Sequence, residues 1–423
     1  MSARILRARL VVPVSEPPID NGAVAIDENR ITAVGPWSQI GHTTTDPVED
    51  LGEVALLPGL INAHCHLDYT NMAGMISPQR RFPDWIKAII AIKASWSYTE
   101  FASSWVAGAQ MLERSGVTSV VDIEAVPELI PEVWQATPLR VWSCLELINL
   151  RSQSNAQQLV SRALSQAREN EQNETNRHGL SPHALYTTTK TLRQSARQRA
   201  ASEKRLLTTH IAESRDEWEM FQSATGDLYN WLNPQRASED RERGSPVAVL
   251  DREGYFNHPV IAAHVNELGE GDAERLAKGN ATVVHCPRSH RYFGHRSFPW
   301  AQLESAGVNL TLGTDSLASV RATRNESPSL DFFAEMSCLA NQKSAPQPDK
   351  ILTWATRNGA IAIDHASDLG LLRANYLADL IAIPYVGDAR SVCESIVFHQ
   401  GPVSASIING QSVPAHKASI TTA

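Results

Sequence analysis

Short apolar segments recur eight times along the middle of the chain, and a helical or irregular stretch follows each of them. Such alternation of short buried strands with helices is typical of βα units that build a parallel sheet. Eight units are the number that a (β/α)8 barrel needs, so the pattern predicts an α/β protein with a TIM barrel. The eight segments are residues 56–63, 117–123, 139–145, 179–181, 206–209, 260–263, 281–285 and 308–313.

Both ends of the chain have a different pattern, in which short alternating strands are separated by turn residues. Neither end offers enough strands to bury a face, so we expect them to pair in one small β-sandwich domain. The predicted strands are residues 5–13, 23–27, 30–34, 378–384, 395–398 and 405–408. The predicted domains are residues 1–56 for the N-terminal part of the β-sandwich, 57–370 for the barrel and 371–423 for the C-terminal part.

Helical periodicity supports the alternating pattern between the apolar segments. The predicted helices are residues 154–174, 192–203, 216–224, 271–278 and 330–341. The stretch 234–245 is dominated by charged residues, and we expect it to be a solvent-exposed surface loop.

Composition and charge narrow the class of protein. The chain has 423 residues, of which 42% are hydrophobic and 20% charged, as in ordinary globular proteins. A net charge of -8 provides no basic surface for nucleic acid or an anionic membrane, so neither is an expected partner. The first apolar stretch is interrupted by Arg7 and Arg9, which argues against a signal peptide or membrane span. We therefore expect a cytoplasmic protein, and a homodimer is the expected oligomeric state.

Five scattered cysteines without a Cys-x-x-Cys pair argue against a disulfide framework or a thiolate metal site. The candidate chemistry lies instead in polar residues directly after the apolar segments, where barrels carry their active sites. These residues are His64, His66, His183, His210, Glu213, His264 and Asp315. Residues two apart in a strand point to the same side, so His64 and His66 can both face one ion while Cys65 points away.

A His-x-His pair alone also occurs by chance, but matching residues at other strand ends strengthen the interpretation. Three imidazoles and one carboxylate form a suitable nitrogen and oxygen site for a divalent ion. We therefore predict that His64, His66, His210 and Asp315 bind one metal ion. Zinc is the expected ion, with Fe²⁺ as the alternative.

Six segments carry a resemblance to a known family: PGLINAHCHLD, SPHALYT, TTHIAES, AAHVNEL, VVHCPRS and LTLGTDSLAS. They resemble the amidohydrolase superfamily, in its mononuclear branch of deaminases and chlorohydrolases, and the deaminases of guanine, S-adenosylhomocysteine and aminodeoxyfutalosine in particular. The resemblance covers nearly the whole chain. It implies the same four metal ligands, and it implies that Glu213 shuttles protons with help from His264 while His183 contacts the substrate.

The residues also support this chemistry by themselves. A metal ion lowers the pKa of water toward neutrality, and neighbouring acids and bases can then relay its protons. The predicted reaction is attack of metal-activated water on a heterocyclic C–NH2 carbon, with Glu213 protonating the ring nitrogen, Asp315 accepting the water proton and ammonia leaving. The alternative without a catalytic role is that the Glu213 carboxylate interacts favourably with the positive N-terminal end of the next helix.

The segment CPRSHRYFGH departs from the deaminase pattern, because His290 stands where the family usually has asparagine. We expect Arg288 and His290 to contact the substrate in an anion-binding or ring-stacking rim. The alternative is a loop held by Phe293 and Gly294. The residues after His66, including Tyr69 and Trp85, are interpreted either as a substrate lid or as a packing surface.

Three functions remain open at this point. The first is a hydrolase of carbon–nitrogen bonds other than peptide bonds, acting as a deaminase on a purine, nucleoside or related small heterocycle. The second is another hydrolysis of a non-peptide C–N or C–Cl bond at the same site. The third is a barrel that has lost catalysis and serves as a scaffold, which intact ligand and proton-relay residues disfavour.

Overall fold

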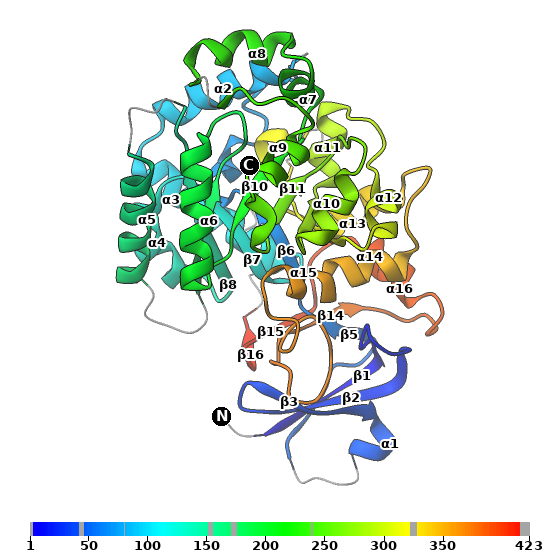
Figure 1. Ribbon diagram of the computed structural model, residues 1–423. Helices are drawn as coiled ribbons and strands as arrows, with labels where there is room; N and C mark the ends of the chain where they lie inside the picture. Colours follow the sequence, from blue (N-terminus) through cyan, green and yellow to red (C-terminus); the bar gives the residue numbers. More distant parts are fainter. Residues whose placement is uncertain are drawn as a thin grey trace. The chain divides into compact units, whose positions relative to one another are not determined.

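The structure is a computed structural model, and it describes residues 3–41, 46–79, 81–150, 155–170, 176–237, 240–321 and 328–414. The chain divides into two compact units (Figure 1). The first consists of Met1–Asn62, Ala109–Ser119 and Asp331–Ala423, and the second of Ala63–Gly108 and Val120–Leu330. Among the described residues, no helix is long and apolar enough to cross a membrane.

The first unit contains a mixed sheet with the order β16-β15-β14-β5-β1-β2-β3, and β4 pairs with β1. Its strands are β1 (Arg4–Val11), β2 (Ile19–Asp27), β3 (Arg30–Pro36), β4 (Val48–Asp50), β5 (Val54–Pro58), β14 (Leu380–Pro384), β15 (Ala405–Ile408) and β16 (Gln411–Val413). Strand β5 joins the two ends of the chain, since it pairs parallel with β1 and antiparallel with β14. These strands form one sheet, so a sandwich of two packed sheets stays a prediction.

Leu6, Val24, Leu56, Leu380 and Ile407 belong to one buried cluster on this sheet. Because these residues come from distant parts of the sequence, burial of their apolar side chains stabilises the pairing of both chain ends.

The helices of the first unit are α1 (Trp37–Ile40), α13 (Phe332–Ala340), α14 (Pro348–Ala355), α15 (Arg357–Ala362) and α16 (Val392–Val397). Helix α16 corrects the prediction of a strand at 395–398. Its buried side chains are Val392, Ile396 and Val397, four and five positions apart, which places them on one face of a helix. The alternation that predicted a strand was too short to distinguish the two periods.

Eight further strands form two four-stranded sheets with the orders β6-β7-β8-β9 and β10-β11-β12-β13. They are β6 (Leu60–Cys65), β7 (Val117–Glu124), β8 (Arg140–Leu147), β9 (Arg177–Pro182), β10 (Thr208–Ile211), β11 (Ile261–His264), β12 (Thr282–His285) and β13 (Asn309–Leu312). Each overlaps one of the predicted segments, and the α/β class is confirmed.

Parallel pairing is recorded for β8 with β9 and throughout the second sheet. Isolated parallel bridges also join positions at the edges of the two sheets, at Leu180 with Leu207 and at Cys65 with Asp315. Closure of both sheets into a single barrel stays a prediction.

The first predicted segment, 56–63, is divided between two strands. Val54–Pro58 is β5 of the mixed sheet, whereas Leu60–Cys65 is β6. Gly59 separates them, and a Cβ atom there would lie 2.1 Å from Thr118 Oγ1, so only glycine allows this close approach.

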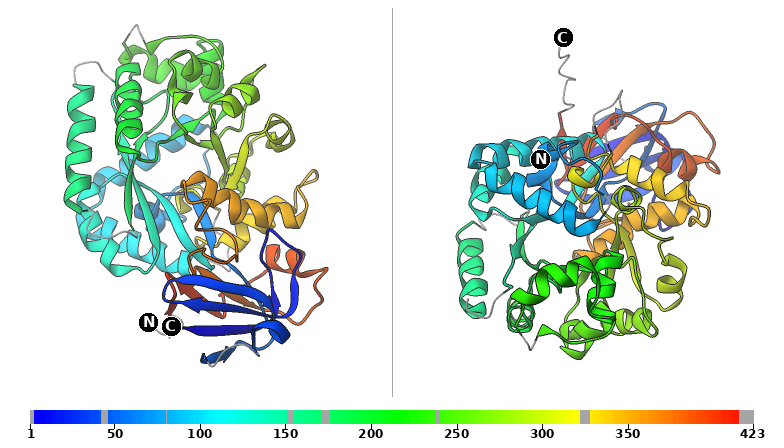
Figure 2. Two further views of the ribbon diagram at one scale, coloured as in Figure 1. Left: turned by 60° about the horizontal axis from the view of Figure 1, so that its bottom comes forward. Right: turned by 90° about the horizontal axis from the view of Figure 1, so that it is seen from above.

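Helices surround the strands of the second unit, as the cyan to green part of Figure 2 shows. They are α2 (Phe82–Ser95), α3 (Tyr98–Arg114), α4 (Ile130–Val133), α5 (Ala156–Asn170), α6 (Lys190–Glu203), α7 (Arg215–Gln222), α8 (Gly226–Leu232), α9 (Pro246–Arg252), α10 (Asp272–Lys278), α11 (Pro287–Phe293) and α12 (Trp300–Ser305). Short 3-10 turns also occur, of which η1 (Leu67–Met72) and η7 (Leu317–Ser319) adjoin the site. Helices α5, α6, α7, α10 and α13 overlap the five predicted ones.

The charged stretch 234–245 is not simply a solvated loop, which corrects its prediction. Arg236 and Asp240 are 4% and 5% exposed, and Arg236 Nη1 donates to the carbonyl oxygen of Leu185 at 2.8 Å. Because a buried charge needs partners, these two residues anchor the stretch to the body of the unit.

Gly313 follows β13 and allows this strand to approach β6. A Cβ atom at this position would lie 2.7 Å from the carbonyl oxygen of His64 and 2.9 Å from Val284 Cγ1. We expect Gly313→Ala to lower the free energy of unfolding by about 1–3 kcal/mol through overpacking. Thermal and denaturant unfolding would measure the loss. Gly35→Ala is the matched control, because the nearest atom there is 3.7 Å away, and an equal effect of both substitutions would contradict the prediction.

Candidate metal centre

Six buried side chains meet at the carboxyl ends of strands in the second unit. Within the described residues, three overlapping groups have ligand atoms within 4.8 Å of one another. They are His64, His210 and His264; His64, His66 and Asp315; and Glu213, His264 and Asp315. The structure therefore brings together all four predicted ligands and both predicted proton-relay residues.

Strand register explains how His64 and His66 meet the other ligands. His64 lies in β6 and His66 two positions further along, so both side chains face the same side. The ring centroids of His64 and His66 are 5.1 Å apart, and those of His64 and His210 are 4.8 Å apart. Cys65 is in none of the three groups, and its thiol interacts with Thr314 instead.

Left-handed backbone conformations mark the ends of three of these strands. Ala212, His264, Val265 and Asp315 have φ values of 48°, 73°, 51° and 55°. Residues other than glycine rarely adopt such values, and strain of this kind concentrates at functional sites. The turns direct His264 and Asp315 into the cluster as their strands end.

Hydrogen bonds orient the donor atoms. His210 Nδ1 donates to the carbonyl oxygen of His183 at 2.9 Å, which leaves Nε2 as the basic nitrogen that can bind a metal. His66 Nε2 lies 3.7 Å and His64 Nε2 3.9 Å from Asp315 Oδ1. Buried His66 Nδ1 and His264 Nε2 have no hydrogen-bond partner among the described residues. The donor set of imidazole nitrogens and carboxylate oxygen fits a divalent ion.

Burial controls the protonation of these groups. Burial, with the charges of His210 and His264, holds the pKa of His64 well below its usual value, and burial likewise lowers the pKa of His66 and His264. The imidazoles are therefore neutral at neutral pH, which is the form that binds a metal. Burial raises the pKa of Asp315, so a nearby cation would favour its ionised form.

Asp315 is held by two neighbouring segments. Ser316 N donates to Oδ1 at 2.8 Å, and Ser319 Oγ donates to Oδ2 at 3.3 Å. The side chain of Ser289, on α11, also hydrogen-bonds to this carboxylate. These contacts keep one ligand at a defined position between η7 and α11.

Glu213 is positioned through its main chain. Its amide donates to Glu217 Oε2 at 2.8 Å, and its carbonyl oxygen accepts from Asn266 Nδ2 at 2.8 Å. Glu213 Oε1 lies 3.8 Å from His264 Nε2. Burial, with Asp315 and Glu217 nearby, raises the pKa of Glu213 well above its usual value. Sequence reasoning gave Glu217 no role in the site, although its position four residues after Glu213 was a usable signal.

A second group of residues lies beside the cluster. His183 Nε2 is 3.9 Å from Glu146 Oε1, and Lys93 Nζ is 3.5 Å from Glu146 Oε2. Burial lowers the pKa of His183 to about 3, while burial of Glu146 is outweighed by Lys93 and His183, which bring its pKa to about 2. Tyr69 stacks on His66 with centroids 5.1 Å apart. Sequence reasoning left Glu146 outside the site and missed Lys93.

The predicted substrate contacts Arg288 and His290 both lie on α11 but outside the three ligand groups. His290 Nδ1 donates to Asn266 Oδ1 at 3.0 Å. Arg288 Nη1 donates to the carbonyl oxygen of Ser329 at 2.8 Å. Because Asn266 also bonds to the Glu213 carbonyl, His290 is linked to the relay residue through one side chain.

Helix α2 packs against α11 and η7. The Trp85 ring lies 5.1 Å from that of Phe293, and Trp85 Nε1 donates to the Ala318 carbonyl oxygen at 3.2 Å. Both interpretations of the residues after His66, a substrate lid or a packing or oligomer surface, stay open.

Comparison with known proteins places this site in a family. The profile of the amidohydrolase family matches residues 55–412, which is most of the chain. The chain therefore belongs to the amidohydrolase family, and the predicted family is confirmed. The family and the deaminase relatives make the chain a hydrolase of carbon–nitrogen bonds other than peptide bonds.

Individual relatives specify the branch. A 5-methylthioadenosine/S-adenosylhomocysteine deaminase of Moorella thermoacetica is 27% identical over 436 residues, covering 97% of this chain and 94% of the relative. An adenosine deaminase of Xanthomonas campestris, solved with bound zinc, superposes with a TM-score of 0.83 at 23% identity, covering 97% and 92% of the two chains. An aminofutalosine deaminase of Helicobacter pylori, solved with methylthio-coformycin, gives 0.86 at 21% identity, covering 97% and 100%. These similarities support the predicted deaminase branch.

Removing one ligand tests the metal centre directly. We expect purified protein to contain about one divalent ion per chain and His210→Ala to lose most of it, because the remaining donors form an incomplete site. Elemental analysis by mass spectrometry would measure the content. His399→Ala is the control, since His399 lies outside the three groups. Full metal content in His210→Ala would exclude His210 as a ligand.

Proposed function

We propose that the protein is a metal-dependent hydrolytic deaminase of an aminated purine, nucleoside or related heterocycle. The observation that carries the proposal is the group of Glu213, His264 and Asp315, whose side-chain atoms lie within 4.8 Å of one another next to the histidine cluster. The group combines a proton donor, an imidazole and a carboxylate at one buried point. The deaminase relatives support the same reaction class.

The proposal includes the architecture that holds the site. The two four-stranded sheets are two halves of one (β/α)8 barrel spanning residues 57–370, and residues 1–56 and 371–423 form the β-sandwich. Parallel bridges between the sheets at Leu180 with Leu207 and at Cys65 with Asp315 support the closure. The fold of the amidohydrolase neighbours is consistent with it. The cytoplasmic location and the homodimer stay predictions.

His64, His66, His210 and Asp315 would hold one divalent ion, and zinc is the proposed identity because neutral imidazole and carboxylate suit it. Fe²⁺ is the alternative. A bound ion of this kind lowers the pKa of water and stabilises negative charge on the reacting centre.

The chain's own residues then move the protons. Water oxygen bonds to the carbon that carries the amino group, and Asp315 accepts the proton that the water loses. Glu213 donates a proton to the neighbouring ring nitrogen, and His264 hydrogen-bonds to the oxygen that the carbon has gained. When the C–N bond breaks, the amino group leaves as ammonia with a proton passed on from Asp315, and the new hydroxyl group returns its proton to Glu213, so that a carbonyl group remains.

The raised pKa of Glu213 suits this role. Burial raises its pKa and thereby favours the protonated carboxyl group, which can donate a proton to the ring nitrogen. Hydrogen bonds from its main chain to Glu217 and Asn266 hold Glu213 in one place while its carboxyl group donates and recovers the proton.

The function is tested by combining metal analysis with an ammonia-release screen. Adenosine, 5-methylthioadenosine, S-adenosylhomocysteine and guanine represent the proposed substrate class. Ammonia release that depends on the metal would support the proposal, and absence of release from every aminated heterocycle by fully metallated protein would contradict it.

Glu213→Gln separates proton transfer from metal binding. We expect kcat to fall by about 10²- to 10⁴-fold, because the amide cannot donate and recover a proton, while the metal content stays unchanged. Glu219→Gln is the matched control, since Glu219 lies on α7 and pairs at the surface with Arg215. If Glu213→Gln kept full ammonia release with metal bound, another residue would have to relay the proton.

A further inference from the structure

The turn that follows β9, residues 183–189 and here called the His183 turn, supports a proposed metal ligand through its main chain. The carbonyl oxygen of His183 accepts hydrogen bonds from His210 Nδ1 at 2.9 Å, from His210 N at 2.8 Å and from Thr209 Oγ1 at 3.2 Å. Because the bond from Nδ1 orients the His210 ring, the position of this carbonyl group determines where His210 Nε2 points. Any residue that fixes the turn therefore acts on the candidate metal centre.

The His183 turn is closed by hydrogen bonds between its own residues. Thr187 N donates to the Ala184 carbonyl oxygen at 3.1 Å, and Ala184 N donates to Thr187 Oγ1 at 3.2 Å. Thr188 Oγ1 donates to the same Ala184 carbonyl oxygen at 2.7 Å. Thr187 Oγ1 also lies 2.7 Å from His183 Nδ1, so one hydroxyl group connects the turn to the His183 side chain. The main chain and the ring of His183 consequently depend on the same turn.

Two buried arginines hold the His183 turn from outside. Arg236, which is 4% exposed, donates from Nη1 to the Leu185 carbonyl oxygen at 2.8 Å. Arg193 lies on α6 and is 1% exposed. Its Nη1 donates to the carbonyl oxygen of Thr188 at 2.5 Å and to the hydroxyl group of the same residue at 3.1 Å. The turn is therefore fixed at two points by guanidinium groups.

Two acidic residues complete this group of charges. Glu253 accepts from Arg193 Nε at 2.8 Å and from Arg193 Nη2 at 2.5 Å. The main chain of Asp240 accepts from Arg236 Nη2, and the Asp240 side chain accepts from Lys190 N, each at 2.5 Å. Replacing buried ion pairs by apolar residues is often neutral or stabilising, so stability alone does not explain such a network. What these contacts supply is a defined geometry of the turn.

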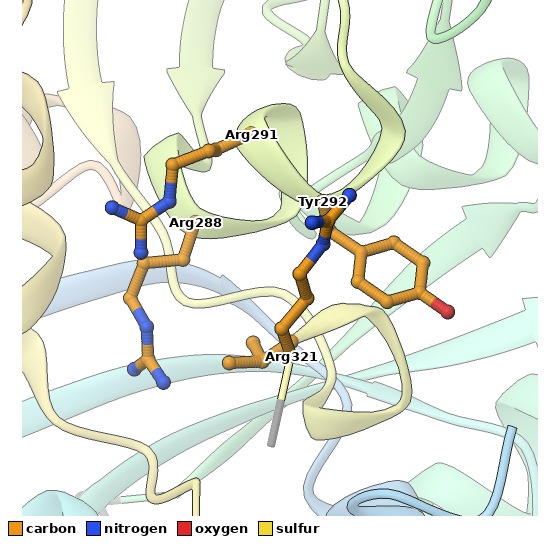
Figure 3. A pocket seen from close by; sticks show the side chains of 5 residues that line it. Arg288, Arg291, Tyr292 and Arg321 are labelled. Atoms are coloured by element: carbon orange, nitrogen blue, oxygen red, sulfur yellow. The ribbon is translucent and has the colours of Figure 1, made fainter. Parts of the chain in front are cut away.

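An arginine-lined cavity elsewhere in the second unit shows a different pattern. Its volume is about 310 Å³, and the residues that line it are Arg288, Arg291, Tyr292, Val320 and Arg321 (Figure 3). Arg291 and Arg321 are exposed, and their side chains lie around the cavity. Arg193 and Arg236, by contrast, are buried, and each donates to a carbonyl oxygen of the same turn. A contribution to surface charge alone would not require such contacts.

From these contacts we propose that the charged stretch 234–245 positions the metal ligand His210. Arg236 of this stretch fixes the His183 turn together with Arg193, and the His183 carbonyl oxygen then orients the His210 ring. Arg236 and Arg193 are positioning residues, since neither belongs to the ligand groups. The ligand role of His210 is part of the proposed function, so this inference rests on that proposal.

The metal affinity of the folded chain tests the proposal without relying on catalysis. We expect Arg236→Met to raise the dissociation constant for Zn²⁺ by about tenfold or more, because groups that orient a histidine ligand contribute about 10- to 100-fold to metal affinity. Arg236→Lys keeps the charge and a donor, so it should recover part of this loss. Competition with a chromogenic chelator measures the constant, at a temperature where circular dichroism shows that each variant is folded.

Arg243→Met is the matched control, because Arg243 is an exposed arginine of the same stretch. It removes the same charge and should leave the dissociation constant unchanged. A merely structural role of Arg236 would lower the free energy of unfolding and leave the metal affinity of the folded variant unchanged. Unchanged affinity in Arg236→Met would overturn the proposal, and so would an equal loss of affinity in Arg243→Met.

A pair of variants at Thr187 decides the question if Arg236→Met does not fold. Thr187→Val removes the hydroxyl group that closes the turn and keeps the shape of the side chain, whereas Thr187→Ser retains the hydroxyl group. We expect the dissociation constant for Zn²⁺ to rise about threefold in Thr187→Val and to keep its wild-type value in Thr187→Ser. Equal affinity of the two variants would then overturn the proposal.

Ammonia release separates this inference from the deaminase function. If no aminated heterocycle releases ammonia while Arg236→Met weakens metal binding and Arg243→Met does not, the deaminase function fails and the positioning role stands. If the wild-type chain releases ammonia but Arg236→Met binds metal as tightly as the wild type, the positioning role alone fails.

Discussion

The constraint on which the site depends is the burial of ionisable groups at the ends of parallel strands. Register places His210 of β10 opposite Ala263 and Ile211 opposite His264 of β11, so successive strands deliver their histidines to one edge. The bridge between Cys65 and Asp315 brings β6 to the end of β13 in the same way. Burial then keeps the imidazoles neutral by lowering the pKa of His64 and His264, while it raises the pKa of Asp315. A divalent cation suits both kinds of group, because it binds neutral imidazole and favours the ionised form of the carboxylate.

Holding this arrangement requires support from the surrounding main chain. The left-handed conformations of His264 and Asp315 are unfavourable by themselves and persist only where neighbouring contacts fix them. Ser316 and Ser319 fix the Asp315 carboxylate, and Asn266 fixes the main chain of Glu213. Gly313 allows β13 to lie close to β6 because it has no side chain. A Cβ atom there would push β13 away from His64. The geometry of the candidate metal centre therefore depends on several strand ends at once.

The grouping of the candidate ligands could be predicted from the sequence because it depends on local signals. His64 and His66 follow an apolar segment at a spacing of two, and His210, His264 and Asp315 each close another such segment. Contacts between residues that are far apart in the sequence leave no local pattern from which they could be predicted. Lys93 reaches Glu146 from 53 positions away, and Arg321 joins Arg288 in one cavity only through the fold. The strand predicted at 395–398 failed because four residues cannot distinguish a period of 2 from one of 3.6, and burial of Val392 and Ile396 gave the helix.

Helix α11 contacts two parts of the candidate site. Ser289 hydrogen-bonds to Asp315, and His290 donates to Asn266, which in turn donates to the Glu213 carbonyl oxygen. This is also the segment where the chain departs from the deaminase pattern, with His290 in place of asparagine. Because Ser289 and His290 are adjacent on one helix, a displacement of α11 would move both contacts together. The positions of Asp315 and of the Glu213 main chain therefore depend on the same short element.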